Sequence, residues 1–510
     1  MAKKREGRED RKKKTGDTVC DLDNGYNSGI QSIGGITPAA VKSLLLNSHY
    51  AQLLLSLTLV GAILRFFNLG YNSLWLDEAS TVTFARLSIP EIWQATTGGE
   101  FNPPLFYWIE HIMLTFGNNE VVLRFIPALM GVLTIPLVYY VGKEFMDRNV
   151  GIIAAALCTF SPFLLFYSQE ARAYSLGLFF VAFAMVFFLK AMKSDSMIHW
   201  ALFGFLSALA FWSHFYTLVI IGTLFLYALA VKIPAIWKDL NAFKPLVAAG
   251  AVFAVVCLPL ILVTIQLFAK RTAGGPTFGI QGIGIILETF RQLSGYTTWL
   301  MYLFVILFVI GVIQAFVLDR HKGILLVLLM VLPFAISWFL SFRIPMSPRY
   351  LIVLAPVFFV GIALAYKPLF TFINNRGIVY AFMGVLVLLS VTTPFFLNYY
   401  SSYTKEDWRG LSQQMYTIAQ PGDTIVLVPG YVAQPFDYYY SNTSGKTLEY
   451  GASTAEQLAA VVPAGTNTTV YYIVTADISS ADPSGDTVKW LEEHVRGIEV
   501  TPGIYLFTSG

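Results

Sequence analysis

Long apolar runs separated by short polar segments dominate the chain between residues 50 and 397. Runs of about 17 to 25 apolar residues are long enough to cross the hydrocarbon core of a bilayer as helices. The pattern contains about eleven such runs and predicts a polytopic α-helical membrane protein. They lie near 50–68, 121–141, 150–166, 174–190, 198–213, 215–231, 246–268, 299–318, 323–341, 350–366 and 378–397.

Two polar segments between the runs are too long to be mere connectors. In 69–119, helical spacing of apolar side chains over 79–96 and over 105–116 predicts helices that lie on the membrane surface. The other segment, 269–298, is rich in glycine at its start and has a helical pattern over 283–293. Such loops often face a site and gate it.

The pattern changes after residue 397, where short strand-like runs alternate with helical ones. Strands are expected at 424–428, 469–474 and 503–508, and helices at 408–418, 455–461 and 488–495. These elements predict a small α/β domain with a core of its own. The expected parts are therefore a basic tail (1–45), a transmembrane domain (46–397) and an α/β domain (398–510).

Composition supports this reading. Hydrophobic residues make up 56% of the 510 residues and charged residues 13%, about half the charged share of soluble domains. The first fourteen residues carry eight Lys/Arg, which is typical of a cytoplasmic tail near anionic lipid. The tail lacks the pattern of a secretory signal peptide, and nucleic acid is not an expected partner.

Lys and Arg in the short loops predict the orientation in the cell membrane. Alternate loops hold at least two of them, whereas 69–119 holds Arg86 alone. The N-terminus is therefore expected in the cytoplasm, and the long loops and the α/β domain outside. Outside cations run against this rule and are candidates to bind an anionic substrate. They are Arg172, Lys270, Arg271, Arg291, Arg343 and Arg349.

Two adjacent carboxylates, Asp77 and Glu78, follow the first apolar run. They fit the first turn of a helix that starts near Ala79, where acids are favoured. They also fit catalysis, with Asp77 as the general base that takes a proton from an acceptor hydroxyl or amine. Adjacent helical residues point about 100° apart, so Glu78 is expected to hold a metal, a cation or a neighbouring loop instead.

Other polar side chains fall at the outside ends of the runs. Arg172 and Tyr174 are candidates to hold a phosphate oxygen, or Arg172 simply pairs with Glu170. Lys270, Arg271 and Arg349 complete the expected phosphate-binding set. His214 is either a hydrogen-bonded structural residue or, with Glu78 or Glu100, a ligand of a divalent metal. The residues expected to line a substrate pocket are Trp75, Asn102, Tyr107, His214 and Tyr350.

Several motifs together resemble the family 39 glycosyltransferases of the membrane-embedded GT-C superfamily, which includes protein O-mannosyltransferases and the aminoarabinose transferase of lipid A. The resemblance covers about residues 50 to 400. The motifs are Trp75-Leu76-Asp77-Glu78-Ala79, Asn102-Pro103-Pro104-Leu105-Phe106-Tyr107, Arg124-Phe125-Ile126-Pro127-Ala128, Tyr167-Ser168-Gln169-Glu170-Ala171-Arg172-Ala173-Tyr174 and Ser347-Pro348-Arg349-Tyr350.

The resemblance implies a GT-C fold and a hexosyl- or pentosyltransferase whose donor is a polyprenyl- or dolichyl-phosphate sugar. It places Asp77 at the catalytic position, and leaves a divalent metal open and the acceptor (lipid, glycan or protein) undefined. The absence of a Gly-rich nucleotide loop agrees with a lipid-linked donor. Relatives often carry Lys or His where this chain has Asn102, so the phosphate needs another cation. The alternatives are a lipid or sugar transporter, a flippase, and a non-catalytic assembly subunit.

Overall fold

The computed structural model describes residues 48–100, 102–276, 278–373, 375, 377–441, 447–461 and 468–509. The chain divides into two compact units, Met1–Gln52 and Leu53–Gly510. The predicted tail, 1–45, lies outside the described residues, and the predicted extent of each domain stays a prediction. The described helices and strands belong to the second unit, except for the first four residues of the helix His49–Phe66.

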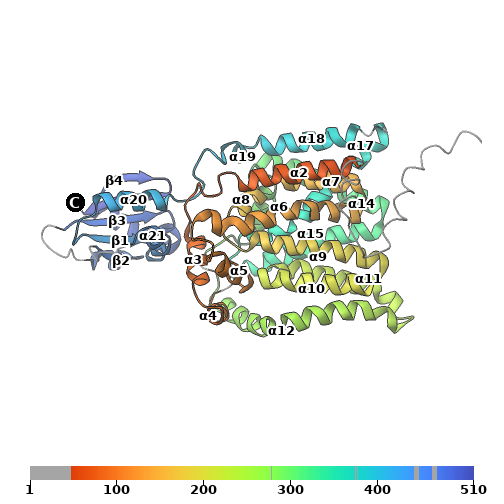
Figure 1. The fold of residues 1–510 in the computed structure, drawn as a ribbon, viewed down its shortest axis with the longest axis horizontal. Coiled ribbons are helices and arrows are strands. Elements are labelled where there is room, and N and C mark those ends of the chain that lie inside the picture. The colour runs from red at the N-terminus through yellow and green to blue at the C-terminus, as the bar shows by residue number, and fades with distance from the viewer. Residues whose placement is uncertain are drawn as a thin grey trace, which may run out of the picture. The chain divides into compact units, whose positions relative to one another are not determined.

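Long apolar helices form the body of this unit (Figure 1). Within the described ranges, eight are long and apolar enough to cross a membrane, or nine with one bent pair. Two shorter apolar helices accompany them, so the expected count of about eleven stays a prediction, while the polytopic helical class is confirmed. The spans are α2 (His49–Phe66), α6 (Glu120–Phe145), α9 (Tyr174–Ser194), α11 (Thr217–Ile236), α12 (Lys244–Thr272) after η1 (Leu240–Phe243), α14 (Thr298–Leu318), α15 (Arg320–Leu340) and η2 (Pro348–Leu354) with α16 (Ala355–Leu364) and α17 (Tyr366–Ile373); the bent pair is α7 (Arg148–Phe160) and α8 (Pro162–Ser168), and the shorter helices are α10 (Met197–Ser213) and α18 (Gly377–Val391), followed by α19 (Pro394–Asn398).

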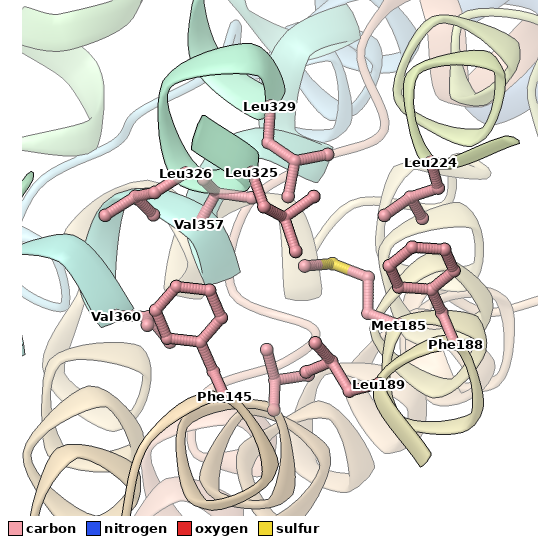
Figure 2. Close-up of a pocket in the computed structure, with 11 residues that line it drawn as sticks. Phe145, Met185, Phe188, Leu189, Leu224, Leu325, Leu326, Leu329, Val357 and Val360 are labelled. Carbon is pink, nitrogen blue, oxygen red and sulfur yellow. The ribbon is translucent and has the colours of Figure 1, made fainter. Parts of the chain in front are cut away.

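A hollow inside the bundle has a purely apolar lining. Figure 2 shows this small hollow, lined by side chains of α6, α9, α11, α15 and α16, among them Phe145, Met185 and Leu189. Met185 and Leu189 lie 11 and 15 residues beyond Tyr174, which is about 16–22 Å along α9. The hollow therefore lies well away from the polar residues around Tyr174.

Three short helices fill the first long loop: α3 (Leu76–Ala85), α4 (Ile89–Gly98) and α5 (Leu105–Met113). The single helix expected over 79–96 is thus wrong, because the chain breaks between α3 and α4. Ser88 caps α4 by exchanging hydrogen bonds with Glu91, and Pro90 occupies its first turn. These signals start a new helix rather than continue the old one. In the second loop, the helix expected over 283–293 is present as α13 (Ile283–Leu293).

After α19 the chain forms a five-stranded sheet in the order β2-β1-β3-β5-β4. The β2-β1-β3 part is parallel, and β5 and β4 run antiparallel. Trp408 and Phe436 lie in the core on one face, and Leu458 and Leu491 in the core on the other. The small α/β domain is therefore confirmed as part of the fold class. Its elements are α20 (Trp408–Ile418), β1 (Thr424–Val428), η3 (Gly430–Val432), α21 (Ala433–Tyr439), β2 (Leu448–Gly451), α22 (Ala455–Ala459), β3 (Val470–Thr475), α23 (Ile478–Ala481), α24 (Asp486–His494), β4 (Val495–Thr501) and β5 (Ile504–Ser509).

Candidate active site

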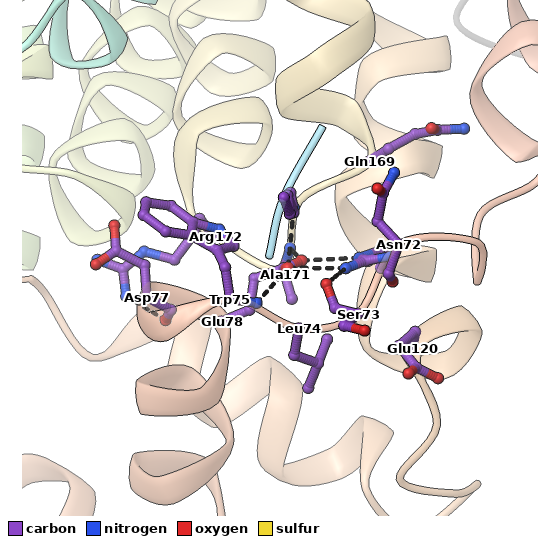
Figure 3. A network of polar contacts seen from close by, with 12 residues as sticks. Asn72, Ser73, Leu74, Trp75, Asp77, Glu78, Glu120, Gln169, Ala171 and Arg172 are labelled. Atoms are coloured by element: carbon purple, nitrogen blue, oxygen red, sulfur yellow. Dashed lines mark hydrogen bonds and ion pairs between the residues drawn. The ribbon is translucent and has the colours of Figure 1, made fainter. Parts of the chain in front are cut away.

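The first turn of α3 carries both acids of the motif. Asp77 and Glu78 point to different sides of the helix, as the spacing predicted (Figure 3). Asp77 is partly accessible, with 23% of its side chain exposed, whereas Glu78 is fully buried. The two carboxylates therefore have different surroundings.

The Asp77 carboxylate faces cations from two other parts of the chain. Its Oδ2 lies 3.0 Å from Nη1 of Arg349, at the start of η2. Nη1 of Arg172, in the turn between α8 and α9, donates to the Asp77 carbonyl oxygen at 3.1 Å and to Oγ1 of Thr81 at 3.3 Å. Both arginines thus converge on one turn of α3, with Arg172 held by the backbone and Arg349 by the carboxylate.

Aromatic rings surround the Arg349 guanidinium. Its carbon lies 5.4 Å from the ring centroid of Trp75, 5.9 Å from that of Tyr174 and 5.7 Å from that of Tyr350. Tyr350 in turn stacks on Tyr216 at 4.7 Å. A guanidinium among aromatic faces keeps its charge and its planar donors available to an anion.

Glu78 lies in a buried ion cluster. Arg124 of α6 binds it with two parallel hydrogen bonds of 2.8 Å, and Nζ of Lys405 lies 2.9 Å from Oε2. The amide of Ala171 donates to Oε1 at 2.8 Å. Burial alone would raise the pKa of Glu78, but Arg124, Lys405 and these hydrogen bonds lower it to about 2. Glu78 is therefore an ionised anchor that joins α3, α6 and the 167–174 segment.

Beside Arg172 lies a narrow pocket with a mixed lining. Its polar side chains are Asn102, Tyr107, Tyr174 and His214, and they lie beside apolar ones. Oε1 of Glu100 accepts from Nδ2 of Asn102 at 2.6 Å and from the Tyr107 hydroxyl at 2.9 Å. Burial, with Arg172 and Arg349 nearby, lowers the pKa of His214 to about 3. The imidazole is therefore neutral, and the pocket offers hydroxyl, amide and guanidinium groups to a ligand.

The Glu170 side chain does not pair with Arg172. Its carboxylate makes no hydrogen bond to Arg172 or to any other described residue, although the side chain is fully buried. Only its backbone oxygen accepts from the Arg172 amide, at 2.7 Å. Burial raises the pKa of Glu170 to about 7, against the attraction of Lys405. The alternative of a Glu170–Arg172 side-chain pair is therefore wrong, because Arg172 turns towards α3 instead.

Comparison with known proteins adds the family context. The family described as dolichyl-phosphate-mannose-protein mannosyltransferase matches residues 102–262. An uncharacterised protein of Aquifex aeolicus (strain VF5) is 33% identical over 107 residues, which are 19% of this chain and 21% of that protein. Among solved structures, ArnT from Cupriavidus metallidurans bound to undecaprenyl phosphate has a TM-score of 0.54 at 11% identity, covering 89% of this chain and 97% of that one. The chain has the GT-C fold.

A second GT-C structure supports the same conclusion. The archaeal oligosaccharyltransferase AglB from Archaeoglobus fulgidus, in complex with an inhibitory peptide and a dolichol-phosphate, has a TM-score of 0.50 at 15% identity. The alignment covers 91% of this chain and 75% of that one. The GT-C fold that the sequence motifs implied is thereby confirmed.

Within this GT-C fold, the predicted site residues separate into two groups. Those that come together around the first turn of α3 are Trp75, Asp77, Glu78, Asn102, Tyr107, Arg172, Tyr174, His214, Arg349 and Tyr350. The other two lie at the end of α12: Lys270 is exposed, and Arg271 lies near Tyr216. Their predicted role in phosphate binding stays a prediction.

The metal ligands considered above do not form a group. In the described ranges, no three His, Cys, Asp or Glu side chains gather in a way that suits a metal ion. Glu78 already binds Arg124 and Lys405, and His214 packs between Tyr174 and Tyr350 at centroid distances of 5.3 and 5.6 Å. Glu78 therefore holds cations and a loop, the other roles expected of it.

Three residues of the site were missed as functional candidates. Arg124 lies in one of the quoted motifs, but it is inside an apolar run, where a charge needs a partner. Glu100 comes shortly before Asn102, and the sequence suggests it only as a metal ligand, not as the hydrogen-bond acceptor of Asn102 and Tyr107. Lys405 carries no sequence signal, because it reaches Glu78 across 327 residues of chain.

Proposed function

We propose that this protein is a glycosyltransferase that moves a hexosyl or pentosyl group from a polyprenyl- or dolichyl-phosphate to an extracytoplasmic acceptor. The observation that carries this proposal is the partly exposed Asp77 carboxylate, set against Arg349 at 3.0 Å and beside Arg172. A base and two phosphate-binding cations within one small site are what transfer from a sugar phosphate requires. The GT-C fold and the mannosyltransferase family match support the same chemistry.

In this mechanism Arg349 exchanges partners. In the free enzyme it neutralises Asp77, whereas in the complex its guanidinium turns to the donor phosphate, for which arginine is well suited. Asp77 is then free to accept the proton of the acceptor hydroxyl or amine. The acceptor atom bonds to the anomeric carbon, the bond from that carbon to the phosphate oxygen breaks, and the polyprenyl phosphate leaves with the electron pair. One direct attack inverts the anomeric centre.

We place the donor sugar against the polar side chains beside Arg172, where the narrow pocket must widen to admit it. Tyr107, Tyr174 and Asn102 offer hydrogen-bonding groups of the kind that orient sugar hydroxyls, and the neutral His214 adds another. We place the acceptor on the side of the α/β domain, which comes close to Asp77: Gln434 of α21 contacts Ser80, one turn beyond Asp77 on α3. We place this side of the cell membrane outside the cell, with the N-terminus in the cytoplasm.

The test is donor consumption by the purified protein in lipid nanodiscs, with a panel of polyprenyl-phosphate hexoses and pentoses and a cell-membrane extract as the acceptor source. Mass spectrometry follows release of the polyprenyl phosphate. We expect one donor to be consumed, and Asp77→Asn to slow its consumption by about 100-fold or more, since a positioned base contributes on the order of 10²–10⁴.

The matched control is Asp486→Asn, which makes the same change at a side chain that is 67% exposed on the α/β domain. It should keep wild-type activity. Normal donor consumption by a folded Asp77→Asn protein would overturn the role of Asp77, and no consumption of any donor by the wild type would overturn the proposed function.

A further inference from the structure

The cluster around Glu78 contains one cation more than its charge requires. Arg124 already neutralises Glu78 with a bidentate pair, and its side chain is 2% exposed. Lys405 is buried as well, at 6% exposure, with its ammonium 5.6 Å from the ring centroid of Phe166. Burying an ammonium is costly unless it is well paired. Lys405 is therefore a second cation on a carboxylate that Arg124 already pairs, and the other acid that attracts it is Glu170.

Lys405 reaches Glu78 as part of a short segment that runs along the backbone before α3. Asp407 accepts a hydrogen bond from the Ser73 hydroxyl at 3.0 Å, and the Arg409 amide donates to the same hydroxyl at 3.1 Å. The Arg409 guanidinium binds the Gly70 carbonyl oxygen at 2.9 Å and Glu120 at 2.6 Å. The segment 405–409 thus contacts the chain on the approach to Asp77 at several successive points.

Lys405 contacts the Glu78 oxygen that also holds the first turn of α3. Lys405 binds Oε2, and the same oxygen accepts from the Trp75 amide at 3.4 Å, which closes the first turn of α3. Asp77 lies inside this turn, and its carbonyl oxygen is the acceptor for Arg172. A shift of Oε2 would therefore loosen the turn that orients Asp77, although Lys405 itself does not touch Asp77.

The α/β domain fixes this segment from the other side. α20 starts at Trp408, which is 1% exposed in the core of that domain. Tyr439 of α21 receives a hydrogen bond from the Leu74 amide at 2.7 Å and donates to Glu120 at 2.6 Å. The segment is thus held between two packed structures, and its position depends on both.

We propose that Lys405 is a positioning residue for Asp77, through which the α/β domain holds the first turn of α3 in the geometry needed for transfer. This proposal rests on the function proposed above for Asp77. The pair Arg124–Glu78 gives α3 its anchor in the bundle, and Lys405 adds the restraint from the α/β domain.

The variants are Lys405→Met, which keeps the aliphatic stem but removes the charge, and Lys405→Arg, which keeps the charge. Because the pair Arg124–Glu78 remains, we expect Lys405→Met to stay folded. Its kcat should fall by about 10- to 100-fold, as for a small misplacement of a catalytic group, with the donor KM changed by less than about 3-fold. Lys405→Arg should recover most of the kcat. Lys489→Met, at a side chain that is 70% exposed, should match the wild type.

Hydrogen–deuterium exchange supplies a readout without substrate. Amides of residues 75–80 should exchange faster in Lys405→Met than in the wild type and regain protection in Lys405→Arg. If no donor is consumed by the wild type but the exchange pattern holds, the proposed function fails while the positioning role stands. Unchanged kcat and exchange in Lys405→Met would overturn the proposal, as would an equal loss in Lys405→Arg. If Lys405→Met does not fold, Lys405→Arg becomes the test. Wild-type amide exchange and wild-type kcat in Lys405→Arg would support the positioning role, and a change in either quantity would overturn it.

Discussion

Glu170 is a carboxyl group of the site whose charge is costly to bury. It is fully buried without a hydrogen-bond partner among the described residues, in the turn that also supplies Ala171 and Arg172. The charged groups that face it are Lys405, Glu78, Arg349 and Asp77. With Glu170 neutral, the cluster of Arg124, Lys405 and Glu78 carries one positive charge, and ionised Glu170 would cancel it. Burial nevertheless dominates and raises the pKa of Glu170 from 4.5 to about 7.

The raised pKa of Glu170 predicts that the effect of Glu170→Gln on stability depends on pH. A raised pKa means that the folded protein binds this proton more tightly than the unfolded chain, so stability falls as the pH rises from about 4.5 through 7. Glutamine cannot ionise. The variant should therefore match the wild type near pH 4.5 and exceed it above pH 7, by up to roughly 3 kcal/mol.

Thermal unfolding of both proteins in detergent between pH 4.5 and 8.5 measures this difference. Glu492→Gln, at an exposed side chain of α24, should give a difference that does not vary with pH. A Glu170→Gln protein that is less stable than the wild type at pH 8 would show that the carboxylate is needed in its ionised form.

At the scale of single residues, the sequence predicts those site residues that stand out in a local pattern. Asp77, Arg172 and Arg349 stand out because they lie at the ends of apolar runs, where polar groups need a function or a partner. The roles of Glu78 and Lys405 depend on each other, and these two residues are 327 positions apart in the chain. No local pattern reports such a pair, so Lys405 could not be predicted.

At the scale of elements, close helix contacts depend on small residues. A Cβ atom on Gly311 of α14 would lie 1.8 Å from the carbonyl oxygen of Gly361 on α16, which is backbone and cannot move aside cheaply. Membrane helices use such glycines to bring their backbones together. We expect Gly311→Ala to destabilise the protein by about 1–3 kcal/mol, as in other overpacked cores.

The control for this substitution is Gly250→Ala in α12, where an added Cβ would meet no atom within 4 Å. Because alanine is the better helix former, this variant should be as stable as the wild type or slightly more so. Unfolding temperatures of the two variants in the same detergent decide the matter. Equal temperatures for both would contradict the close contact of α14 and α16.

Element bounds also show why some strands were not predicted. The apolar pattern gives β1 at its observed bounds, because all five of its residues are buried. β2 forms an edge of the sheet and has three exposed residues out of four, so its sequence shows no strand pattern. β4 follows α24 directly, and the helical pattern expected over 488–495 runs into its start. Edge strands depend on their neighbour for hydrogen bonds, which sequence periodicity does not report.

For the whole molecule, the orientation in the membrane decides which substrates reach the site. The α/β domain is joined to the residues around Asp77 by Lys405, Arg409 and Tyr439. Asp77 and the α/β domain therefore lie on the same side of the membrane. α9 starts at the site with Tyr174 and ends at Ser194 after 21 residues, which is about 31 Å and enough to cross the hydrocarbon core. Lys193, in the last turn of α9, therefore lies on the opposite side from Asp77.

Cysteine labelling tests the predicted orientation in intact cells. The natural Cys158 and Cys257 are buried, and Cys20 is replaced by serine. Single cysteines then replace Lys489 of the α/β domain, whose side chain is 70% exposed, and Lys193, at 52%. A membrane-impermeant maleimide should label the cysteine at position 489 in intact cells, and the one at 193 only after the membrane is opened. The reverse pattern would place Asp77 in the cytoplasm, where the acceptor would have to be a cytoplasmic molecule, and would contradict the orientation inferred from the Lys and Arg of the loops.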